Sequence, residues 1–259
     1  MERSELVEML DVADMVLVGV GEDFEEKDSL LLEESYRKVC DGVAAAGVEW
    51  VMPYVNRFFL EKNEKLKTAL HALGGLLEKR NYFVVSVCMN GMTAGAGLLP
   101  DRLTEPCGSY TKLQCSKGCA GSIQPVEEEF LREMEQCIQG EKNWKALRAP
   151  VCEKCQAPMV FNSLYAEHYN EEGYRENWER YTKWLQGTVG KKLCILELGA
   201  GMMFAGILRF RFEKIAALNQ KASIVRVHRS LYQMPGEISG RGKSISQNAV
   251  DFMAEMIVL

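Results

Sequence analysis

The sequence predicts an α/β protein with a parallel sheet covered by helices on both faces and a small inserted lobe. Short β-branched apolar runs alternate with helical patterns, as strands and crossover helices do in such sheets. The stretch 105–160 breaks this alternation with two close cysteine pairs. With 259 residues, 47% of them hydrophobic, the chain has enough apolar material for one sizeable domain carrying an insert.

Four apolar runs are predicted as buried strands, because each is bounded by Gly, Asn or a charged residue. They are residues 14–19 (DMVLVG), 82–88 (YFVVSVC), 193–199 (LCILELG) and 223–228 (SIVRVH). The segment 239–244 (SGRGKS) lacks the spacing of a phosphate-binding P-loop and is interpreted as a surface loop.

Helical periodicity occupies the stretches between these strands. Residues 63–80 and 171–187 each place large apolar residues four, three and four positions apart, which is the spacing of one helix face. These residues are Leu66, Leu70, Leu73 and Leu77 in the first segment, and Tyr174, Trp178, Tyr181 and Leu185 in the second. The aromatic face of the second segment is interpreted as core packing.

Residues 105–160 are predicted to form the inserted lobe, with residues 1–104 and 161–259 forming the main domain. The insert contains several Gly and Pro and one amphipathic segment, 125–140. One face of that segment carries Val126, Phe130, Met134 and Cys137. We therefore expect a small lobe with one helix and little core of its own.

Four cysteines of the insert have the spacing of a zinc site. Cys115 and Cys119 form a C-x3-C pair, and Cys152 and Cys155 form a C-x2-C pair. Two tight turns of this kind supply the four soft ligands of tetrahedral zinc. A site with four thiolates has no open position, so the predicted Zn²⁺ is structural and stabilises the lobe.

Two glycine loops follow predicted strands. Gly19 and Gly21 end the first strand, and Gly199 and Gly201 follow the third. Such loops let a backbone approach a pyrophosphate, although a tight turn that only packs a helix on a sheet also needs glycine. Glu22 and Asp23 directly follow the first loop.

Those two carboxylates oppose phosphate binding if they face the ligand. A carboxylate about 6 Å from a phosphate charge costs on the order of 3 kcal/mol at an effective dielectric near 20. The positive end of a helix N-terminus stabilises a bound phosphate by only about 0.3 to 2 kcal/mol. The repulsion between these carboxylates and a phosphate would therefore exceed the stabilisation by the helix N-terminus.

Composition disfavours some partners. The net charge of −5 is spread along the chain, which disfavours a nucleic-acid surface or an acidic membrane as partner. No apolar run reaches the roughly 18 to 20 residues that span a bilayer, and the first ten residues carry several charges. We expect a cytoplasmic protein whose cysteines are metal ligands, core residues or reactive thiols.

Several motifs together resemble the sirtuins, and specifically the divergent branch encoded beside macrodomain proteins in microbes. They are the strand YFVV, the cysteine motifs CGSYTKLQCSKGC and PVCEKCQAPM, the aromatic segment GYRENWERYTKWL, and the block from Leu196 to Val227 that begins LELGAGMMFAG. This resemblance covers most of the chain. It implies a Rossmann-type NAD-binding domain plus a zinc lobe, with the reaction in the cleft between them.

The resemblance also implies chemistry. Sirtuins break the bond between nicotinamide and ribose and transfer the ADP-ribosyl unit to an acyl-lysine oxygen, with a histidine as general base. The macrodomain-linked branch carries Gln there and is associated with protein ADP-ribosylation. The implied ligands and partners are NAD or ADP-ribose and a protein substrate.

Matching motif to motif assigns the remaining site residues. Cys107 stands at the catalytic His or Gln position, and Arg209 follows the second cofactor loop. The family segment that serves the nicotinamide end, Thr-Thr-Asn-Val-Asp, corresponds to residues 86–90. Within it Ser86 and Cys88 are candidate cofactor-binding residues, and Asn90 is a candidate catalytic residue.

Three interpretations of function remain open. In the first, the chain consumes NAD, with ADP-ribose transfer or deacylation as the reaction. In the second, loss of the catalytic base and the polar loop residues leaves a silent sirtuin-fold module that binds a protein or a nucleotide. In the third, Cys107 is a redox or zinc sensor, since thiol reactivity follows thiolate content.

Overall fold

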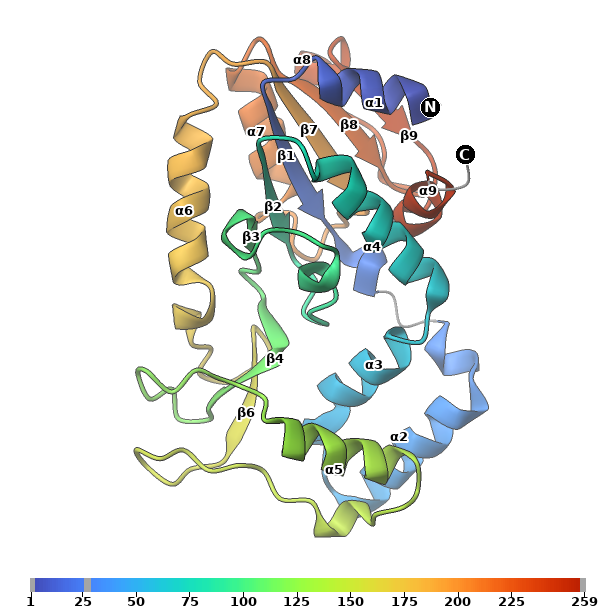
Figure 1. Ribbon diagram of the computed structural model, residues 1–259, viewed down its shortest axis with the longest axis vertical. Coiled ribbons are helices and arrows are strands. Elements are labelled where there is room, and N and C mark those ends of the chain that lie inside the picture. Colours follow the sequence, from blue (N-terminus) through green and yellow to red (C-terminus); the bar gives the residue numbers. More distant parts are fainter. Residues whose placement is uncertain (1–2, 26–28, 257–259) are drawn as a thin grey trace.

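The computed structural model describes residues 3–25 and 29–256, which form two lobes (Figure 1). The larger lobe is built on strands β1 (Met15–Val20), β2 (Tyr82–Ser86), β3 (Leu103–Thr104), β7 (Leu193–Leu198), β8 (Ser223–Val227) and β9 (Gly242–Ile245). Among the described residues, these six strands pair in parallel in the order β3-β2-β1-β7-β8-β9. The predicted α/β class and parallel sheet are confirmed.

The four strands predicted from apolar runs correspond to β1, β2, β7 and β8, whose residues are almost all buried. The two edge strands were missed because β3 spans two residues and β9 is polar. The interpretation of 239–244 as a surface loop is wrong in part, since Gly242 to Ser244 pair with β8. An edge strand needs no apolar alternation, which is why its sequence resembles a loop.

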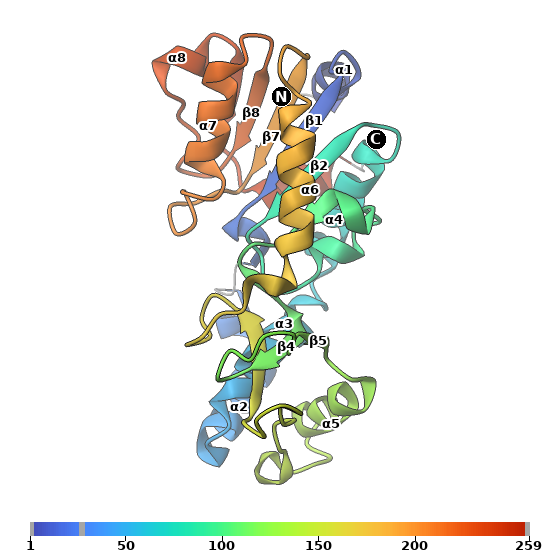
Figure 2. The ribbon, with the colours of Figure 1, turned by 90° about the vertical axis from the view of Figure 1, so that its left-hand side faces the viewer.

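Helices cover both faces of the sheet. Those of the larger lobe are α1 (Arg3–Asp11), α4 (Glu64–Leu77), α6 (Arg175–Gln186), α7 (Arg209–Leu218), α8 (Gly236–Ser239) and α9 (Ala249–Glu255). Figure 2 shows α7 and α8 on one side of the sheet and α1 and α4 on the other. The predicted helices at 63–80 and 171–187 are α4 and α6. In α4, Asn63 caps the first turn by accepting a hydrogen bond from the Leu66 backbone.

The aromatic face of α6 packs on the sheet, as predicted. The rings of Tyr181 and Trp184 lie 5.4 and 5.9 Å from the ring of Phe83 in β2. The indole of Trp184 also donates a hydrogen bond to Asn81 at 2.8 Å. These aromatic side chains are therefore core residues.

Within the described ranges, the smaller lobe contains a three-stranded antiparallel sheet and three α-helices. Its strands are β4 (Gly108–Cys115), β5 (Gln124–Pro125) and β6 (Met159–Ser163), in the order β5-β4-β6. Its helices are α2 (Glu34–Ala46), α3 (Met52–Leu60) and α5 (Glu128–Ile138). The predicted amphipathic helix is α5, in which Phe130, Met134 and Cys137 are buried, whereas Val126 is buried but precedes the helix.

Helices α2 and α3 precede the predicted insert but lie beside it (Figure 1). Trp50 stacks on Phe130 of α5 at 5.9 Å, and the Tyr54 hydroxyl donates to Glu135 of α5 at 3.1 Å. These long-range contacts carry no local sequence signal. The predicted boundaries of the insert, 105 and 160, remain predictions.

The strand order places a topological switch point between β1 and β7. The chain proceeds from β1 through β2 to β3 on one side, and from β7 through β8 to β9 on the other. Ligands of open α/β sheets bind where the order reverses, beyond the carboxyl ends of the strands. The two glycine loops follow these two strands. No helix in the described ranges is long and apolar enough to cross a membrane.

Candidate functional site

The two predicted glycine loops lie against each other at the switch point. The Gly21 backbone donates a hydrogen bond to the Leu198 carbonyl at 2.8 Å. A Cβ atom on Gly21 would overlap the carbonyl oxygen of Gly199 and the backbone of Ala200. Glycine at position 21 is therefore required by contact between the loops, in addition to any contact with a ligand.

The two carboxylates after Gly21 bind backbone amides. Glu22 Oε2 accepts a hydrogen bond from the Gly201 backbone at 2.7 Å, and its Oε1 accepts one from Phe204 at 3.2 Å. Asp23 Oδ2 accepts one from the Ala249 backbone, at the start of α9, at 2.9 Å. Both carboxylates therefore bind backbone amides of distant segments, which the sequence of the first loop alone does not reveal.

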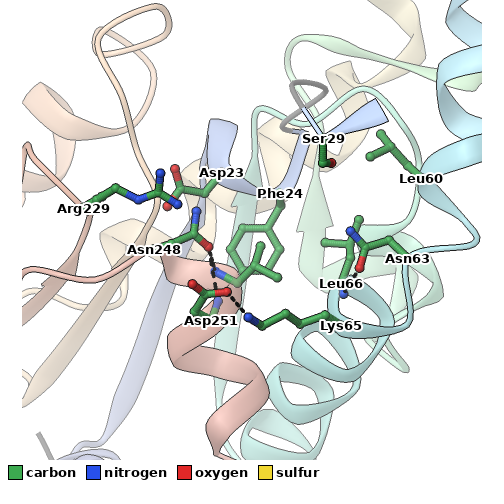
Figure 3. Close-up of a pocket in the computed structure, with 11 residues that line it drawn as sticks. Asp23, Phe24, Ser29, Leu60, Asn63, Lys65, Leu66, Arg229, Asn248 and Asp251 are labelled. Atoms are coloured by element: carbon green, nitrogen blue, oxygen red, sulfur yellow. Dashed lines mark hydrogen bonds and ion pairs between the residues drawn. The ribbon is translucent and has the colours of Figure 1, made fainter. Parts of the chain in front are cut away.

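A pocket of about 120 Å³ lies beside the first loop. Figure 3 shows Asp23 beside Arg229 and Asn248 at one side of this pocket, and the ion pair of Lys65 with Asp251 at another. Acidic and basic side chains are mixed along its wall. It therefore lacks the consistent charge that would select an anionic ligand.

Residues 86–90, which correspond to the family segment that serves the nicotinamide end, hold the first glycine loop in place. The Ser86 hydroxyl accepts a hydrogen bond from the Cys88 backbone at 3.2 Å, and the Cys88 thiol donates to the Gly21 carbonyl at 3.1 Å. The Asn90 side chain donates to the Phe24 carbonyl at 2.9 Å. All three side chains are buried, and each supports the backbone of the chain.

Cys107 is fully buried immediately before β4. Burial raises the pKa of its thiol far above the ordinary value, and the charges of Glu25 and Glu22 raise it further. A thiol in this environment is neutral at physiological pH. It cannot serve as a general base, and its burial opposes the interpretation of Cys107 as a redox sensor.

Glu105 is a half-buried titratable residue, with a buried Oε1 atom, that the sequence did not reveal. Burial raises the pKa of its carboxyl to about 7, and Glu25 adds to this effect while Lys112 opposes it. Among the described residues, its Oε1 atom has no hydrogen-bond partner. The one available signal was its place two residues before Cys107, which does not indicate burial.

Arg209 holds the second glycine loop through hydrogen bonds to backbone carbonyls. Its guanidinium donates to the carbonyl of Ala200 at 3.4 Å and to that of Gln233 at 3.2 Å. Burial lowers the pKa of Arg209, with the charge of Arg226 acting in the same direction. The residue is largely committed to backbone partners within the chain.

The buried ion pair of Glu197 and Arg226 was not predicted from the sequence. Arg226 in β8 binds both carboxylate oxygens of Glu197 in β7, at 2.6 and 3.0 Å, and also contacts Glu213 at 2.8 Å. Positions 197 and 226 are paired in the strand register. Opposite charges inside two apolar runs were the available signal for it.

The four predicted zinc ligands come together in the smaller lobe. The sulfur atoms of Cys115, Cys119, Cys152 and Cys155 all lie within 4.8 Å of one another. A tetrahedral zinc site with bonds near 2.3 Å needs sulfur atoms about 3.8 Å apart, so the cluster fits such an ion.

The chemistry of Cys115 also suits a metal ligand. Burial raises the pKa of its thiol, but hydrogen bonds from the Cys119 and Lys117 backbones outweigh this and bring the pKa to about 6. Metals bind the thiolate form. The donor set therefore fits a structural metal ion.

Exposed apolar side chains follow β6 and lie in and after the second glycine loop. The Tyr165 hydroxyl, after β6, lies 3.6 Å from the sulfur of Met203 in the second glycine loop. Tyr165 is 65% exposed and Met203 is 71% exposed. Leu164 and Met202, their neighbours in the chain, and Phe210 in α7 are also exposed. We call these five residues the junction patch.

Comparison with solved structures decides the fold. A structure described as a Sir2 homologue mutant in complex with ADP-ribose matches 99% of this chain and 95% of its own, at 13% identity and a TM-score of 0.59. A sirtuin bound to a propionylated peptide matches 99% and 98%, at 14% identity and a TM-score of 0.55. The chain has the sirtuin fold. The predicted resemblance is therefore confirmed at the level of the fold.

Two curated relatives resemble the sirtuin-fold chain in sequence. A protein ADP-ribosyltransferase from Staphylococcus aureus is 24% identical over 173 residues, and a probable bifunctional ADP-ribose hydrolase/ADP-ribosyltransferase from Fusarium oxysporum f. sp. cubense is 26% identical over 152 residues. These matches cover 66% and 56% of this chain. They cover 54% of the first relative and 25% of the second. No family model matches the chain.

Several of the candidate site residues lie around the switch point of this sirtuin-fold chain. Two glycine loops meet at the switch point, and the charges of Glu22 and Glu25 act on Cys107 of the smaller lobe. The roles assigned to Gly19, Gly21, Ser86, Cys88, Asn90, Cys107, Gly199, Gly201 and Arg209 remain predictions.

Proposed function

We propose that this chain is a sirtuin-type protein of the class that transfers ADP-ribose from NAD, with a degenerate reaction site and a structural zinc ion. The fold and the names of the two curated relatives support the class. The observation that carries the proposal is the meeting of the two glycine loops at the switch point of the sheet. We also assign a cytoplasmic location and a protein substrate or partner.

The reaction class defines what the chain must supply. The bond between nicotinamide and ribose breaks, and the acceptor side chain bonds to the ribose carbon as its proton leaves. A positioned base contributes typically 10² to 10⁴-fold to such proton transfers. Since Cys107 carries a neutral buried thiol, that contribution is missing at the family's catalytic position. We therefore expect slow transfer.

A second candidate function is protein binding without turnover. The junction patch favours it, because exposed aromatic and Met side chains are the kind that protein interfaces bury. The hydrogen bonds of Glu22 to the second loop favour it too, since they occupy donors that a phosphate would use. In this alternative, the sirtuin fold provides a surface that binds a partner protein and catalyses no reaction.

The two candidates are separated by titrating zinc-loaded protein with NAD in a calorimeter and measuring nicotinamide release with an acceptor protein mixture. The first candidate predicts release that saturates with NAD and a mass gain on an acceptor equal to one ADP-ribosyl unit. Activity must follow the protein across a sizing column, which controls for contaminating enzymes. No binding and no release at millimolar NAD would exclude the first candidate and leave the second.

A further inference from the structure

The carboxylate of Glu22 occupies backbone amides of the second glycine loop. Its two oxygens accept from Gly201 at 2.7 Å and from Phe204 at 3.2 Å, across sequence separations of 179 and 182 residues. The pairing of β1 with β7 brings these distant positions together. A Cβ atom on Gly201 would lie 3.2 Å from Glu22 Oε1, so the carboxylate packs closely on the loop.

This contact has the chemistry of a bound anion. Two converging backbone N–H groups form the kind of donor set that binds phosphate oxygens at glycine loops. A carboxylate offers two charged acceptor oxygens to the same donors. A phosphate cannot use these donors while Glu22 holds them, and it would be repelled by the carboxylate charge.

The turn that carries Glu22 is held from several sides. Asp23 accepts from the Ala249 backbone at 2.9 Å, and the Phe24 carbonyl accepts from Asn90 at 2.9 Å. The Cys88 thiol donates to the Gly21 carbonyl at 3.1 Å. The backbone of Glu22 is thus positioned by contacts of its neighbours with distant segments of the chain.

We propose that Glu22 is an internal anionic plug, which holds the phosphate-binding amides of the second loop closed against a nucleoside diphosphate. The choice of ligand class rests on the proposed function, whereas the plug itself rests on the hydrogen bonds of Glu22. Binding of a diphosphate at this loop requires the carboxylate to leave. The chain thereby carries an autoinhibitory contact at its own switch point.

The test compares Glu22→Ala with Asp23→Ala by calorimetric titration with inorganic pyrophosphate and with ADP-ribose. The two variants remove one carboxylate each from the same turn, so they change the net charge equally. Only Glu22→Ala frees the amides of Gly201 and Phe204. We expect it to bind both probes at least about tenfold more tightly than the wild type, with Asp23→Ala within about twofold of the wild type.

Two results would overturn the plug. One is a folded Glu22→Ala protein whose affinity for both probes equals that of the wild type. The other is an equal gain in both variants, which would be an effect of net charge alone. A gain for pyrophosphate without one for ADP-ribose would support the plug and contradict the proposed ligand class. The outcomes for the two proposals are therefore distinguishable.

A measurement on the wild type covers the case in which the variants do not fold. In protein labelled with ¹⁵N-glycine, the amide signal of Gly201 should stay in place as pyrophosphate is added to millimolar concentration, because Glu22 already occupies that donor. A saturable shift of the Gly201 signal would show that a free anion reaches the amide, which contradicts the plug.

Discussion

At the scale of single residues, polar side chains of the candidate site are engaged with the chain itself. Glu22 and Asp23 bind backbone amides, and Asn90 binds a backbone carbonyl. Buried polar groups that lack partners are costly, so this mutual satisfaction stabilises the closed arrangement of loops. Glu105 is the exception that can be tested, because its Oε1 has no partner among the described residues.

The raised pKa of Glu105 predicts a pH dependence of stability. The pKa in the folded state is about 7, above the ordinary value of 4.5, so the folded state holds the proton more tightly. The contribution of Glu105 to stability should therefore be fully present below pH 4.5 and be lost as pH rises through 7, a change on the order of 3 kcal/mol for this group. In Glu105→Gln this contribution is absent.

Urea unfolding of wild type and Glu105→Gln at pH 5.0 and 7.5 measures the effect. The difference in unfolding free energy between variant and wild type should shift in favour of the variant by about 2 to 3 kcal/mol at the higher pH. Glu78→Gln, at an exposed position, is the matched control and should show no such shift. Equal pH profiles for Glu105→Gln and wild type would contradict the assignment.

At the scale of elements, close packing of backbone against backbone sets the positions of the loops. Gly74 lies in α4 where a Cβ atom would overlap the carbonyl oxygen of Ala96. Gly75 is the next residue of the same helix, is exposed, and has nothing within 4 Å of its Cβ position. Alanine at Gly74 therefore tests packing, whereas alanine at Gly75 tests helix propensity at a neighbouring position of the same helix.

We expect opposite effects from alanine at these two positions. Gly74→Ala should lower the free energy of unfolding by about 2 kcal/mol or more, because α4 must move away from the 93–97 turn. Gly75→Ala should raise it by about 0.5 to 1 kcal/mol, because alanine is the better helix former. Guanidinium unfolding of both variants checks this, and a stabilised Gly74→Ala protein would refute the packing argument.

At the scale of the whole molecule, the two lobes depend on different sources of stability. The larger lobe has a parallel sheet buried between helices, whereas the smaller lobe has a three-stranded antiparallel sheet and the four-cysteine cluster. Small lobes often need a further constraint besides their core, and a metal ion bound at this cluster would supply one. Loss of zinc should therefore affect the smaller lobe first.

Cys152→Ser should abolish stoichiometric zinc binding, measured by elemental analysis of the purified protein. Hydrogen exchange should then accelerate at least about tenfold in β4 and β6 while β1 and β7 keep their protection. Cys40→Ser, outside the cluster and half-buried, is the matched control and should keep one zinc ion per chain. Full zinc content in Cys152→Ser would contradict the assignment of the cluster.

The sequence by itself predicted the features that leave a local or periodic signal. The four central strands follow from β-branched runs, α4, α5 and α6 follow from helical spacing, and the cysteine pairs follow from ligand spacing. Motif resemblance added the sirtuin fold. Each of these depends on residues close together in the chain, or on a pattern shared with a family.

Tertiary structure decided what depends on residues far apart in the chain. The sequence placed Glu22 and Asp23 beside a phosphate loop and predicted repulsion, but it could not show that Glu22 binds Gly201 or that Asp23 binds Ala249. It showed Glu197 and Arg226 only as charges within apolar runs, and the strand register made them a pair. The burial of Cys107 likewise depends on how distant parts of the chain pack around it. Hydrogen-bond partners and desolvation are set by distance in space, and only the folded chain determines that distance.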